Sequence, residues 1–529
     1  MAVATSYPGV YVEEIPSGVH TITGVATSIA AFVGWADQGP IDYAGLCLSW
    51  SDFQRIYGGF DARSPYLGYA VSQFFINGGQ QAYIVRLAYT GDKTSTLTPA
   101  GSASLTLGGL TFTAGTVGPD GQVAHAANPG VWAQNYGITI KKQSGGGNRF
   151  RVQVIYAPAG ATSEVVVESY ENLSITTPDS QGRYVADVIN KQSSYVTVAV
   201  ASGTTNPPSD TTAPSASNPT PSPHLKGNST DDGTVLLPST DSSTGGEFET
   251  LLGSVTDVLD QIDLFNLLCV PGEIVTATIG TLETYCEGRR AFLIADCDPG
   301  ITDISKLTQT PTTGMNSAFY FPWIQAPDPL NQNRPAYFPP CGFVAGIYAR
   351  TDGTRGVWKA PAGTEATVTG ASGVMVPLND KQNGLLNPLG INCIRNFSVY
   401  GIVLWGARTM QGNDELGSQW KYIPVRRTAL FIEESLYRAL KWAVFEPNDE
   451  PLWAELRLNV GSFMQNLFRQ GAFQGQTPAD AYFVKCDNET TTQNDINLGI
   501  VNLLVGFAPL QPAEFVVIQI QQMAGQIAT

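Results

Sequence analysis

Apolar residues in the first ninety positions form short continuous runs that alternate with runs of helical period. Residues 27–40 are typical of a buried strand, and residues 49–60 of a short helix with a serine near its start. Apolar side chains at helical spacing from Leu67 onward predict a second helix, and residues 82–87 predict a strand. A strand, a helix and a strand in succession indicate a layered α/β core.

The pattern changes near residue 93 to short runs in which valine alternates with threonine and serine, so residues 93–202 predict a mainly β region. Residues 203–233 follow with six prolines and with Leu225 as the only large aliphatic residue. Such a segment cannot bury enough surface to order itself, and we expect a flexible loop. The α/β pattern then resumes. We therefore expect one α/β (α+β) core domain, residues 21–92 and 234–510, that is split by a mainly β, outward-facing insertion domain.

Two amphipathic helices are predicted near the end of this core. The first is expected to run to Pro447, with an apolar stripe at Ile432, Leu436, Ala439 or Leu440, and Ala443. The second is expected to begin at Pro451 and to end at Gly471, with an apolar stripe at Leu452, Leu456, Val460, Phe463 and Leu467.

Both ends of the chain predict a strand outside the core, an N-terminal linking arm of residues 1–20 and a C-terminal linking arm of residues 511–529. Pro8 and Pro16 flank the apolar run of the first arm, which is typical of an edge strand. An exposed strand either folds back onto its own core or adds to the sheet of a neighbouring chain. The pattern of these residues leaves both alternatives open.

Composition narrows the classes of partner. Charged residues make up 14% of the 529 positions, against roughly 25% in typical soluble domains, so we expect much of the surface to be covered by other copies of the chain. The net charge of −16 argues against nucleic-acid binding, because phosphate contacts need clustered lysine and arginine.

The chain begins without a basic and apolar leader, so we expect synthesis and folding in a cytoplasm without a signal peptide. No apolar run is long enough to predict a membrane span, and no direct membrane insertion is expected. Cysteines dispersed without a CxxC pair are expected to be buried free thiols; they are Cys47, Cys269, Cys286, Cys297, Cys341, Cys393 and Cys486.

Signals for an enzyme are weak. Each histidine stands alone, and no HExxH, GxSxG, P-loop or GxGxxG pattern is present, so we expect no catalytic, metal-binding or cofactor-binding residue. Asp296 and Asp298 flank Cys297 at a predicted strand end, where α/β sites occur, but Asp-Pro-Gly is also an ordinary turn. The group Arg350, Asp352, Arg355, Trp358 and Lys359 is expected to be an internal pairing network, with turns at Gly353, Gly356 and Gly363.

An ordered set of longer segments resembles the tail sheath proteins of contractile bacteriophages and of phage-tail-like contractile injection systems. The segments are "YPGVYVEEIPSG" (7–18), "GVATSIAAFVGWADQGP" (24–40), "FFINGGQQAYIVRLA" (74–88), "ARTDGTRGVWKAPAG" (349–363), "GINCIRNFSVYGIVLWGARTM" (390–410), "YIPVRRTALFIEESLYRALKWAVFEPNDEPLW" (422–453) and "PAEFVVIQIQ" (512–521). The resemblance covers residues 1 to about 90 and about 260 to 529. It is loose in the predicted insertion, and the proline-rich loop departs from it.

This resemblance implies a structural subunit. In the family, both arms complete a small β-sheet with strands of adjacent subunits, so that head-to-tail contacts build a helical homo-polymer. The partners implied are the chain itself, an inner tube protein, and baseplate and tail terminator or cap proteins. The sheath assembles in an extended metastable state and contracts to drive the tube through a target membrane, without a cofactor. The resemblance places the protein in a phage virion tail or in a phage-tail-like particle that is extracellular, membrane-anchored or cytoplasmic, with a lean towards the injection systems.

Two groups of residues follow from the resemblance. The expected inter-subunit arm strands are Val10, Tyr11, Val12, Ile15, Phe515, Val516, Val517, Ile518 and Ile520. The pool for tube contact, taken from a charged helix and its adjoining loop, is Arg426, Arg427, Arg438, Lys441, Glu446, Asp449, Glu450, Glu455 and Arg457. A solvated helix face is the alternative for most of the pool. The alternative functions are a static structural or capsid-type assembly protein and, with less support, an α/β enzyme.

Overall fold

The structure is a computed structural model that describes residues 20–91, 97–117, 125–143, 148–159, 161, 163–211, 222–226 and 232–519. It is a mixed α/β fold, as the sequence predicts. The chain divides into two units. The larger unit comprises residues 27–354 and 361–423, and the smaller unit comprises the described parts of residues 1–26, 355–360 and 424–529.

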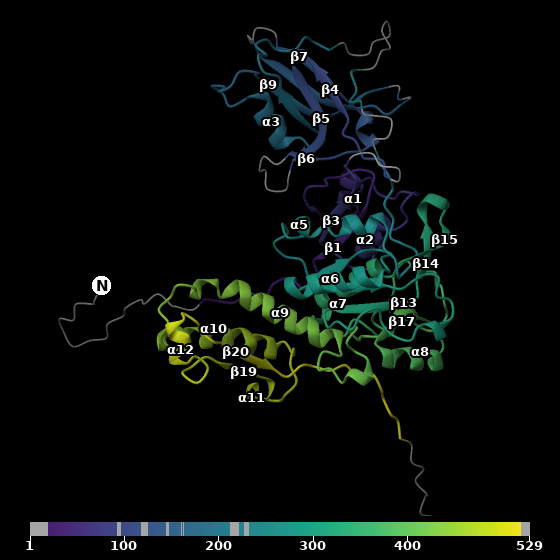
Figure 1. Ribbon diagram of the computed structural model, residues 1–529, viewed down its shortest axis with the longest axis vertical. Helices are drawn as coiled ribbons and strands as arrows, with labels where there is room; N and C mark the ends of the chain where they lie inside the picture. Colours follow the sequence, from purple (N-terminus) through teal and green to yellow (C-terminus); the bar gives the residue numbers. More distant parts are fainter. Residues whose placement is uncertain are drawn as a thin grey trace, which may run out of the picture. The chain divides into compact units, whose positions relative to one another are not determined.

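An eight-stranded sheet, called here the core sheet, organises the larger unit (Figure 1). Its order is β18-β17-β13-β12-β11-β1-β3-β2; the six strands from β17 to β3 run parallel to one another, and the edge strands β18 and β2 are antiparallel to them. The bounds are β1 Ala30–Trp35, β2 Gly45–Cys47, β3 Ala82–Leu87, β11 Leu267–Cys269, β12 Phe292–Asp296, β13 Ser317–Phe321, β17 Ile391–Phe397 and β18 Gly401–Leu404. Most of the parallel strands are mainly apolar runs because a parallel sheet is covered on both faces, whereas β17 also carries Asn392, Arg395 and Asn396.

The helices of the larger unit are α1 Trp50–Tyr57, α2 Leu67–Ile76, α4 Glu247–Leu252, α5 Thr256–Leu259, α6 Thr276–Arg289, α7 Cys341–Arg355 and α8 Asp380–Leu386. The predicted serine cap of α1 is confirmed: Ser49 accepts the amide of Asp52 at 3.2 Å. A small antiparallel sheet adds β14 Ile324–Asp328, β15 Arg334–Phe338 and β16 Gly373–Val374.

The order of the core sheet reverses between β1 and β11, and this is the point where open α/β sheets bind ligands beyond the carboxyl ends of their strands. The chain fills that crevice itself. Leu236, Pro238 and Phe248 line it together with Trp35 and Tyr66, and they leave no volume that a water molecule could occupy. The usual ligand position of such a sheet is therefore occupied by protein side chains.

The described residues between Ala103 and Leu225 form a second hydrophobic core within the larger unit, called here the mainly β part. One sheet has the order β10-β5-β4 with β6 beside β5, and another has the order β7-β8-β9. The bounds are β4 Ser104–Leu107, β5 Leu110–Val117, β6 His125–Ala127, β7 Tyr136–Lys142, β8 Phe150–Tyr156, β9 Val165–Leu173, α3 Val185–Gln192 and β10 Val196–Val200.

The sequence predicts a flexible loop for residues 203–233, but two parts of this segment, at Thr211 and at residues 224–225, are ordered by contacts with the mainly β part. The Thr211 amide donates to the Ile140 carbonyl at 2.9 Å, and Leu225, 1% exposed, lies in the core of the mainly β part. His224 bridges to Gly137. The segment cannot order itself, but strand β7 supplies the backbone partners and the pocket that order these residues.

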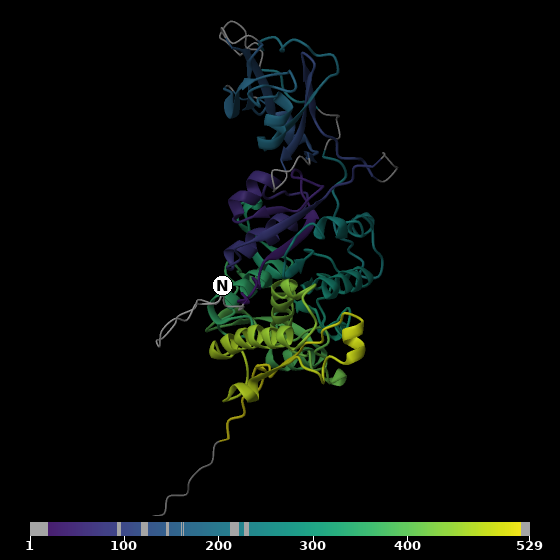
Figure 2. The ribbon, with the colours of Figure 1, turned by 90° about the vertical axis from the view of Figure 1, so that its left-hand side faces the viewer.

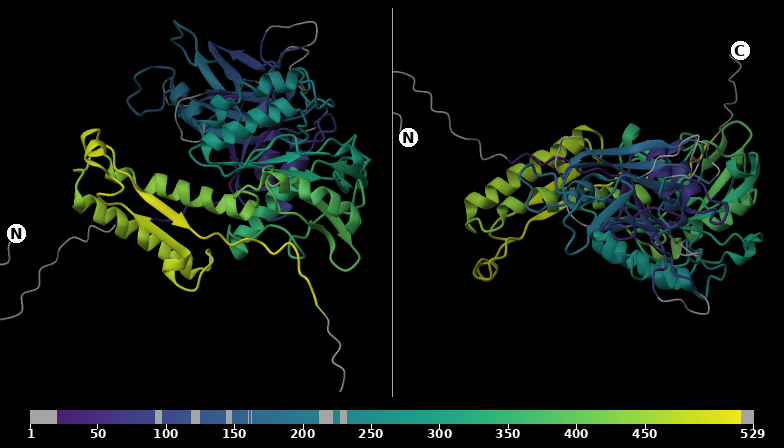
Figure 3. Two further views of the ribbon diagram at one scale, coloured as in Figure 1. Left: turned by 60° about the horizontal axis from the view of Figure 1, so that its bottom comes forward. Right: turned by 90° about the horizontal axis from the view of Figure 1, so that it is seen from above.

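The smaller unit is built on two long helices, α9 Ile423–Ala439 and α10 Glu450–Arg469, seen in Figure 3. It also contains α11 Pro478–Ala481, β19 Tyr482–Lys485, α12 Gln493–Asn497 and β20 Leu504–Phe507. The predicted apolar stripe of α10 is confirmed, because all five of its residues are buried. Helix α9 ends earlier than predicted: a short 3-10 turn, Lys441–Ala443, replaces its last turns before Pro447.

The seven cysteines are all buried and free, which confirms the prediction from their spacing. Among the described residues, no helix has both the length and the apolar character that crossing a bilayer requires.

Candidate assembly surfaces

Strands β19 and β20 form a two-stranded antiparallel sheet with register pairs from Tyr482–Phe507 to Lys485–Leu504. One face packs on α10 through Tyr482, Val484, Val505 and Phe507. Within the described part of the chain, neither strand pairs with a further strand. Both outer edges therefore offer backbone hydrogen-bonding groups, and a sheet of only two strands is marginal by itself.

Residues 511–519, called here the C-terminal segment, continue from this region as an extended trace (Figure 2). Phe515, Val516, Val517 and Ile518 are between 76% and 81% exposed, and the C-terminal segment has no regular secondary structure. The sequence predicts a strand here, but a strand requires a partner and the described residues provide none. Val10, Tyr11, Val12, Ile15 and Ile520 lie outside the described residues.

Several residues of the charged pool are structural and do not present a free charged face. Arg426 and Arg427 are buried on α9, and Arg426 pairs with Glu433 at 3.1 Å. Arg438 pairs with Glu434 at 2.6 Å on the same helix. Arg457 pairs with Glu450 at 2.5 Å and donates to the Cys486 carbonyl. Helix α9 turns the side chains of Arg426 and Arg427 away from solvent, and no observation on the single chain tests their predicted contact with a tube.

The connection between α9 and α10 holds most of the exposed members of the pool. Lys441, Glu446, Asp449 and Glu450 are exposed, whereas Glu455 is half-buried. Asp449 also caps α10, accepting the Glu450 amide at 2.7 Å. This connection also exposes two apolar side chains, Val444 and Phe445, and Phe445 has φ 72°. Sequence patterning missed this apolar tip because it treated the segment as the end of a helix.

Asp296 and Asp298, the candidate residues of the alternative enzyme hypothesis, make structural hydrogen bonds. The Asp296 carboxylate is buried and accepts the amides of Gly272 at 2.9 Å and Cys341 at 2.7 Å. Burial raises the pKa of Asp296 to about 6 against the lowering effect of these hydrogen bonds, and burial raises the pKa of Cys297 as well. Asp298 accepts the Gly300 amide at 2.7 Å, which is the predicted turn. No group of metal-ligating side chains gathers among the described residues.

The cluster around Arg350 is an internal network, as expected, with one difference. Arg350 donates to the Thr367 carbonyl at 2.6 Å, and Asp352 accepts the Thr27 hydroxyl at 2.7 Å. Gly356 has positive φ, but Gly353 lies inside helix α7 and makes no turn.

Glu273, just after β11, is a buried carboxyl with an incomplete set of partners. One oxygen accepts the Val275 amide at 2.7 Å, and the other has no hydrogen-bond partner among the described residues. Burial raises the pKa of Glu273 to about 8, and the charge of Glu249 adds to the rise against the hydrogen bond from Val275. The folded protein thus holds a proton that the unfolded chain, with an ordinary pKa of 4.5, releases.

This carboxyl predicts a pH dependence of stability. As the pH rises from about 4.5 to about 8, the unfolded chain loses the proton first, so the free energy of unfolding falls. Glu273→Gln is expected to remove this dependence and to stabilise the protein by about 1–3 kcal/mol at pH 8, with a smaller gain at pH 5. Urea unfolding at both pH values measures the effect. Glu287→Gln, at an exposed position on α6, is the matched control, and equal gains in both variants would contradict the prediction.

Comparison with known protein families gives two matches. A sequence model described as the phage tail sheath protein central domain matches residues 254–410, and one described as the phage tail sheath C-terminal domain matches residues 415–523. A protein of Pseudomonas aeruginosa (strain UCBPP-PA14) named as a prophage major tail sheath protein is 26% identical over 267 residues. The matched segment spans 49% of this chain and 66% of that protein.

Solved structures share the fold. The sheath complex of an extracellular contractile injection system, PVC, in its contracted state matches with a TM-score of 0.57 and 23% identity, over 98% of this chain and 99% of that one. The helical sheath of the anti-feeding prophage in its contracted state matches with a TM-score of 0.56 and 24% identity, over 98% of this chain and 100% of that one.

Proposed function

The chain belongs to the phage tail sheath protein family, which makes it a structural sheath subunit, and we propose that it polymerises head to tail through strand exchange. The two linking arms, residues 1–20 and 511–529, join neighbouring subunits into a helical sheath around an inner tube. The sheath belongs to a phage tail or to a contractile injection system.

One observation supports the proposal most directly: the smaller unit contains an extended apolar segment that could add to a sheet, the donor, and a small sheet with open edges, the acceptor, and within the described part of one chain the two do not pair. The donor is the C-terminal segment with its four exposed apolar residues, Phe515 to Ile518. The acceptor is the two-stranded sheet of β19 and β20, whose outer edges are open. A strand added from a neighbouring chain buries the apolar side chains and completes the backbone hydrogen bonds of both partners.

Identical donors and acceptors on every copy give a heterologous interface, which grows into a helix when its rotation does not close. The low charge content, 14%, supports a surface that is largely covered in the assembly. The sheath forms in an extended metastable state around the tube and contracts as the subunits rotate as rigid bodies. The contracted states of the two similar sheaths support this step. Residues 93–202 face outward as an insertion.

We propose that the exposed connection between α9 and α10 contacts the inner tube. Its exposed acidic residues Glu446, Asp449 and Glu450 follow the exposed apolar residues Val444 and Phe445 in the chain. A tube protein that binds there presents basic groups around an apolar depression.

Electron microscopy of the full chain, alone and with tube and baseplate partners, tests both contacts. We expect striated hollow cylinders, long and narrow with a tube inside or short and wide without one. The triple variant Glu446→Gln, Asp449→Asn and Glu450→Gln is expected to polymerise but to lose the enclosed tube. Globular particles under every condition would contradict the sheath proposal, and filled tubes with the triple variant would contradict the tube contact alone.

A further inference from the structure

The mainly β part is connected to the core of the larger unit by two chain segments that run side by side. Thr234 donates its amide to the Thr98 carbonyl at 2.9 Å, and the Thr98 amide donates to the Thr234 hydroxyl at 2.7 Å. Neither segment belongs to a helix or a strand at this point. The orientation of the mainly β part therefore depends on side-chain contacts across the junction.

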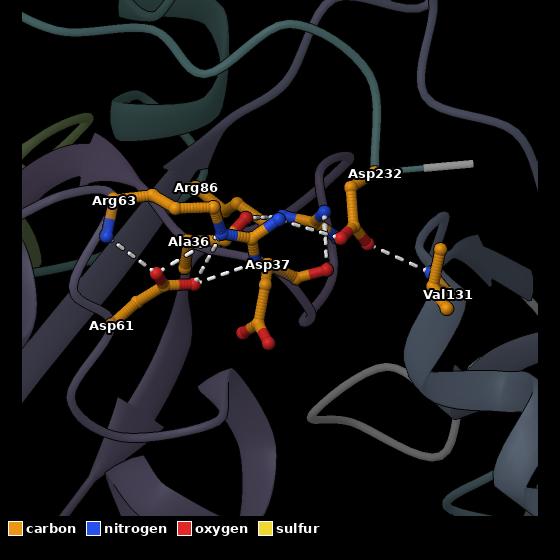
Figure 4. Close-up of polar contacts among 7 residues, drawn as sticks. All are labelled: Ala36, Asp37, Asp61, Arg63, Arg86, Val131 and Asp232. Carbon is orange, nitrogen blue, oxygen red and sulfur yellow. Dashed lines mark hydrogen bonds and ion pairs between the residues drawn. The ribbon is translucent and has the colours of Figure 1, made fainter. Parts of the chain in front are cut away.

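Arg86 of β3 makes the buried contact across this junction, and Figure 4 shows its hydrogen bonds to Ala36 and Asp37 on the core side. Its guanidinium, 2% exposed, donates to the carbonyls of Ala36 at 2.7 Å, Asp37 at 3.0 Å, Gly39 at 2.7 Å and Pro129 at 2.8 Å. The first three acceptors follow β1 in the core, and Pro129 belongs to the mainly β part. We call Arg86 with these four carbonyls the pivot.

Two backbone features bring the pivot together. Asn128 accepts the Gly39 amide at 2.8 Å, which ties the mainly β part to the same core loop. Gly130 has φ 141°, and a Cβ there would lie 2.3 Å from the Asp37 carbonyl oxygen. Only glycine allows the two backbones to approach this closely.

Arg63 makes the exposed contact across the junction (Figure 4). On the core side, two of its guanidinium nitrogens donate to the Asp61 carboxylate at 2.6–3.1 Å, and the guanidinium lies 5.0 Å from the centre of the Trp35 ring. On the connecting segment it pairs with Asp232 at 2.8 Å. Asp232 is held by the Val131 amide at 2.8 Å. We call the Arg63–Asp232 pair the latch, because Asp232 joins Arg63 of the core to Val131 of the mainly β part.

The pivot and the latch respond differently to the solvent. The latch is an ion pair with an arginine side chain that is 44% exposed, so dissolved salt screens it. In the pivot the hydrogen-bond acceptors of the buried cation are neutral carbonyls, and the Asp37 carboxylate also attracts it; because Arg86 is buried, screening by salt has little effect there. Opening the latch leaves Arg63 paired with Asp61, whereas opening the pivot leaves a buried charge without partners.

A cleft of about 330 Å³ lies beside the joint. Tyr43, Leu46 and Ile56 line it from the core, and Trp132, Tyr136 and Tyr195 line it from the mainly β part. One wall of the cleft belongs to the core and the other to the mainly β part. The width of the cleft therefore changes with the angle between these two parts.

We propose that the pivot and the latch form a two-level joint, in which the mainly β part swings about Arg86 when the Arg63–Asp232 pair opens. Ionic strength sets the populations of the closed and open positions. The proposal rests on the contacts inside one chain and is independent of the sheath function.

Distances between spin labels across the cleft test the joint. Leu46→Cys and Ser194→Cys place labels at exposed positions on opposite walls, and the native cysteines are all buried. In the full chain, diluted with unlabelled protein, we expect one narrow distance distribution at low salt. Arg63→Gln and Asp232→Asn are each expected to add a longer-distance population, and about 1 M salt is expected to do the same to the wild-type protein.

Two further measurements separate the proposal from its alternatives. Arg55→Gln removes a charge beside the same cleft, where Arg55 pairs with Asp52 at 3.2 Å and does not cross the junction, and it is expected to leave the distribution narrow. Hydrogen exchange of peptides containing Gly39 is expected to stay slow in Arg63→Gln, because the pivot persists. An unchanged distribution in both latch variants, the same broadening in Arg55→Gln, or fast exchange at Gly39 would each overturn the two-level joint.

Discussion

Replacing Val516 and Ile518 by aspartate in the full chain is expected to leave the fold intact and to raise the critical concentration for polymerisation about 100-fold or more. Both side chains are about four-fifths exposed in the single chain, so the change removes no packing there. In the proposed assembly both lie on one face of a strand added to a neighbour, where burial of each contributes about 1.5–3 kcal/mol. Sedimentation over a range of concentrations measures the loss.

The matched control adds the same two charges outside the predicted strand of Phe515 to Ile520, with Gln511→Asp and Gln522→Asp, and is expected to polymerise nearly as the unmodified chain does. Thermal unfolding of both variants checks that the fold is kept. Equal loss in both variants would point to repulsion between charged segments. Undiminished polymerisation of the Val516 and Ile518 variant would mean that the C-terminal segment is not the donor strand.

Gly346→Ala on helix α7 is expected to lower the free energy of unfolding by about 3 kcal/mol. A Cβ at Gly346 would lie 2.5 Å from the Phe74 carbonyl oxygen and 2.6 Å from the Asn77 Cβ. Helix α7 therefore packs against α2 backbone to backbone, and an added methyl group has to push the two helices apart. Urea unfolding measures the change.

The same helix provides the control. Gly353→Ala is the same substitution on α7, but a Cβ there has no neighbour within 4 Å. It is expected to stabilise the protein by up to about 1 kcal/mol, because alanine favours the helix over glycine. The changes in the free energy of unfolding of the two variants should therefore have opposite signs. A similar change in both would mean that helix propensity decides their stability and that the close approach of α2 does not.

Local sequence patterns predicted most of the regular elements. Five of the six parallel strands of the core sheet, β1, β3, β11, β12 and β13, are mainly apolar runs, and such runs are visible in the chain before any packing is known. The sixth, β17, contains Asn392, Arg395 and Asn396 and was not predicted. The stripe of α10 was likewise predicted residue by residue, from Leu452 to Leu467. The end of α9 was placed too late, because no proline or glycine marks Leu440 and the 3-10 turn after it depends on packing.

The assembly surfaces were only partly accessible from sequence. The apolar run Phe515 to Ile518 can be recognised in the sequence. Whether it is exposed depends on the rest of the fold and cannot be predicted from the run itself. Arg426 and Arg427 look like neighbouring surface charges in the sequence, yet the helix turns both towards the interior. The charge of a side chain is local information, whereas the direction in which the helix points it depends on contacts with distant elements.

By itself, the sequence determined the class of the core, the apolar faces of its main helices and the two apolar ends, because each depends on residues close together in the chain. Only the tertiary structure decided which groups meet. Arg86 and Pro129, and Arg63 and Asp232, are far apart in sequence, and contact across the junction requires both sheets to be formed first. The same holds for Leu236 and Phe248, which fill the crevice between β1 and β11. Such contacts follow from the path of the whole chain, and no local pattern encodes them.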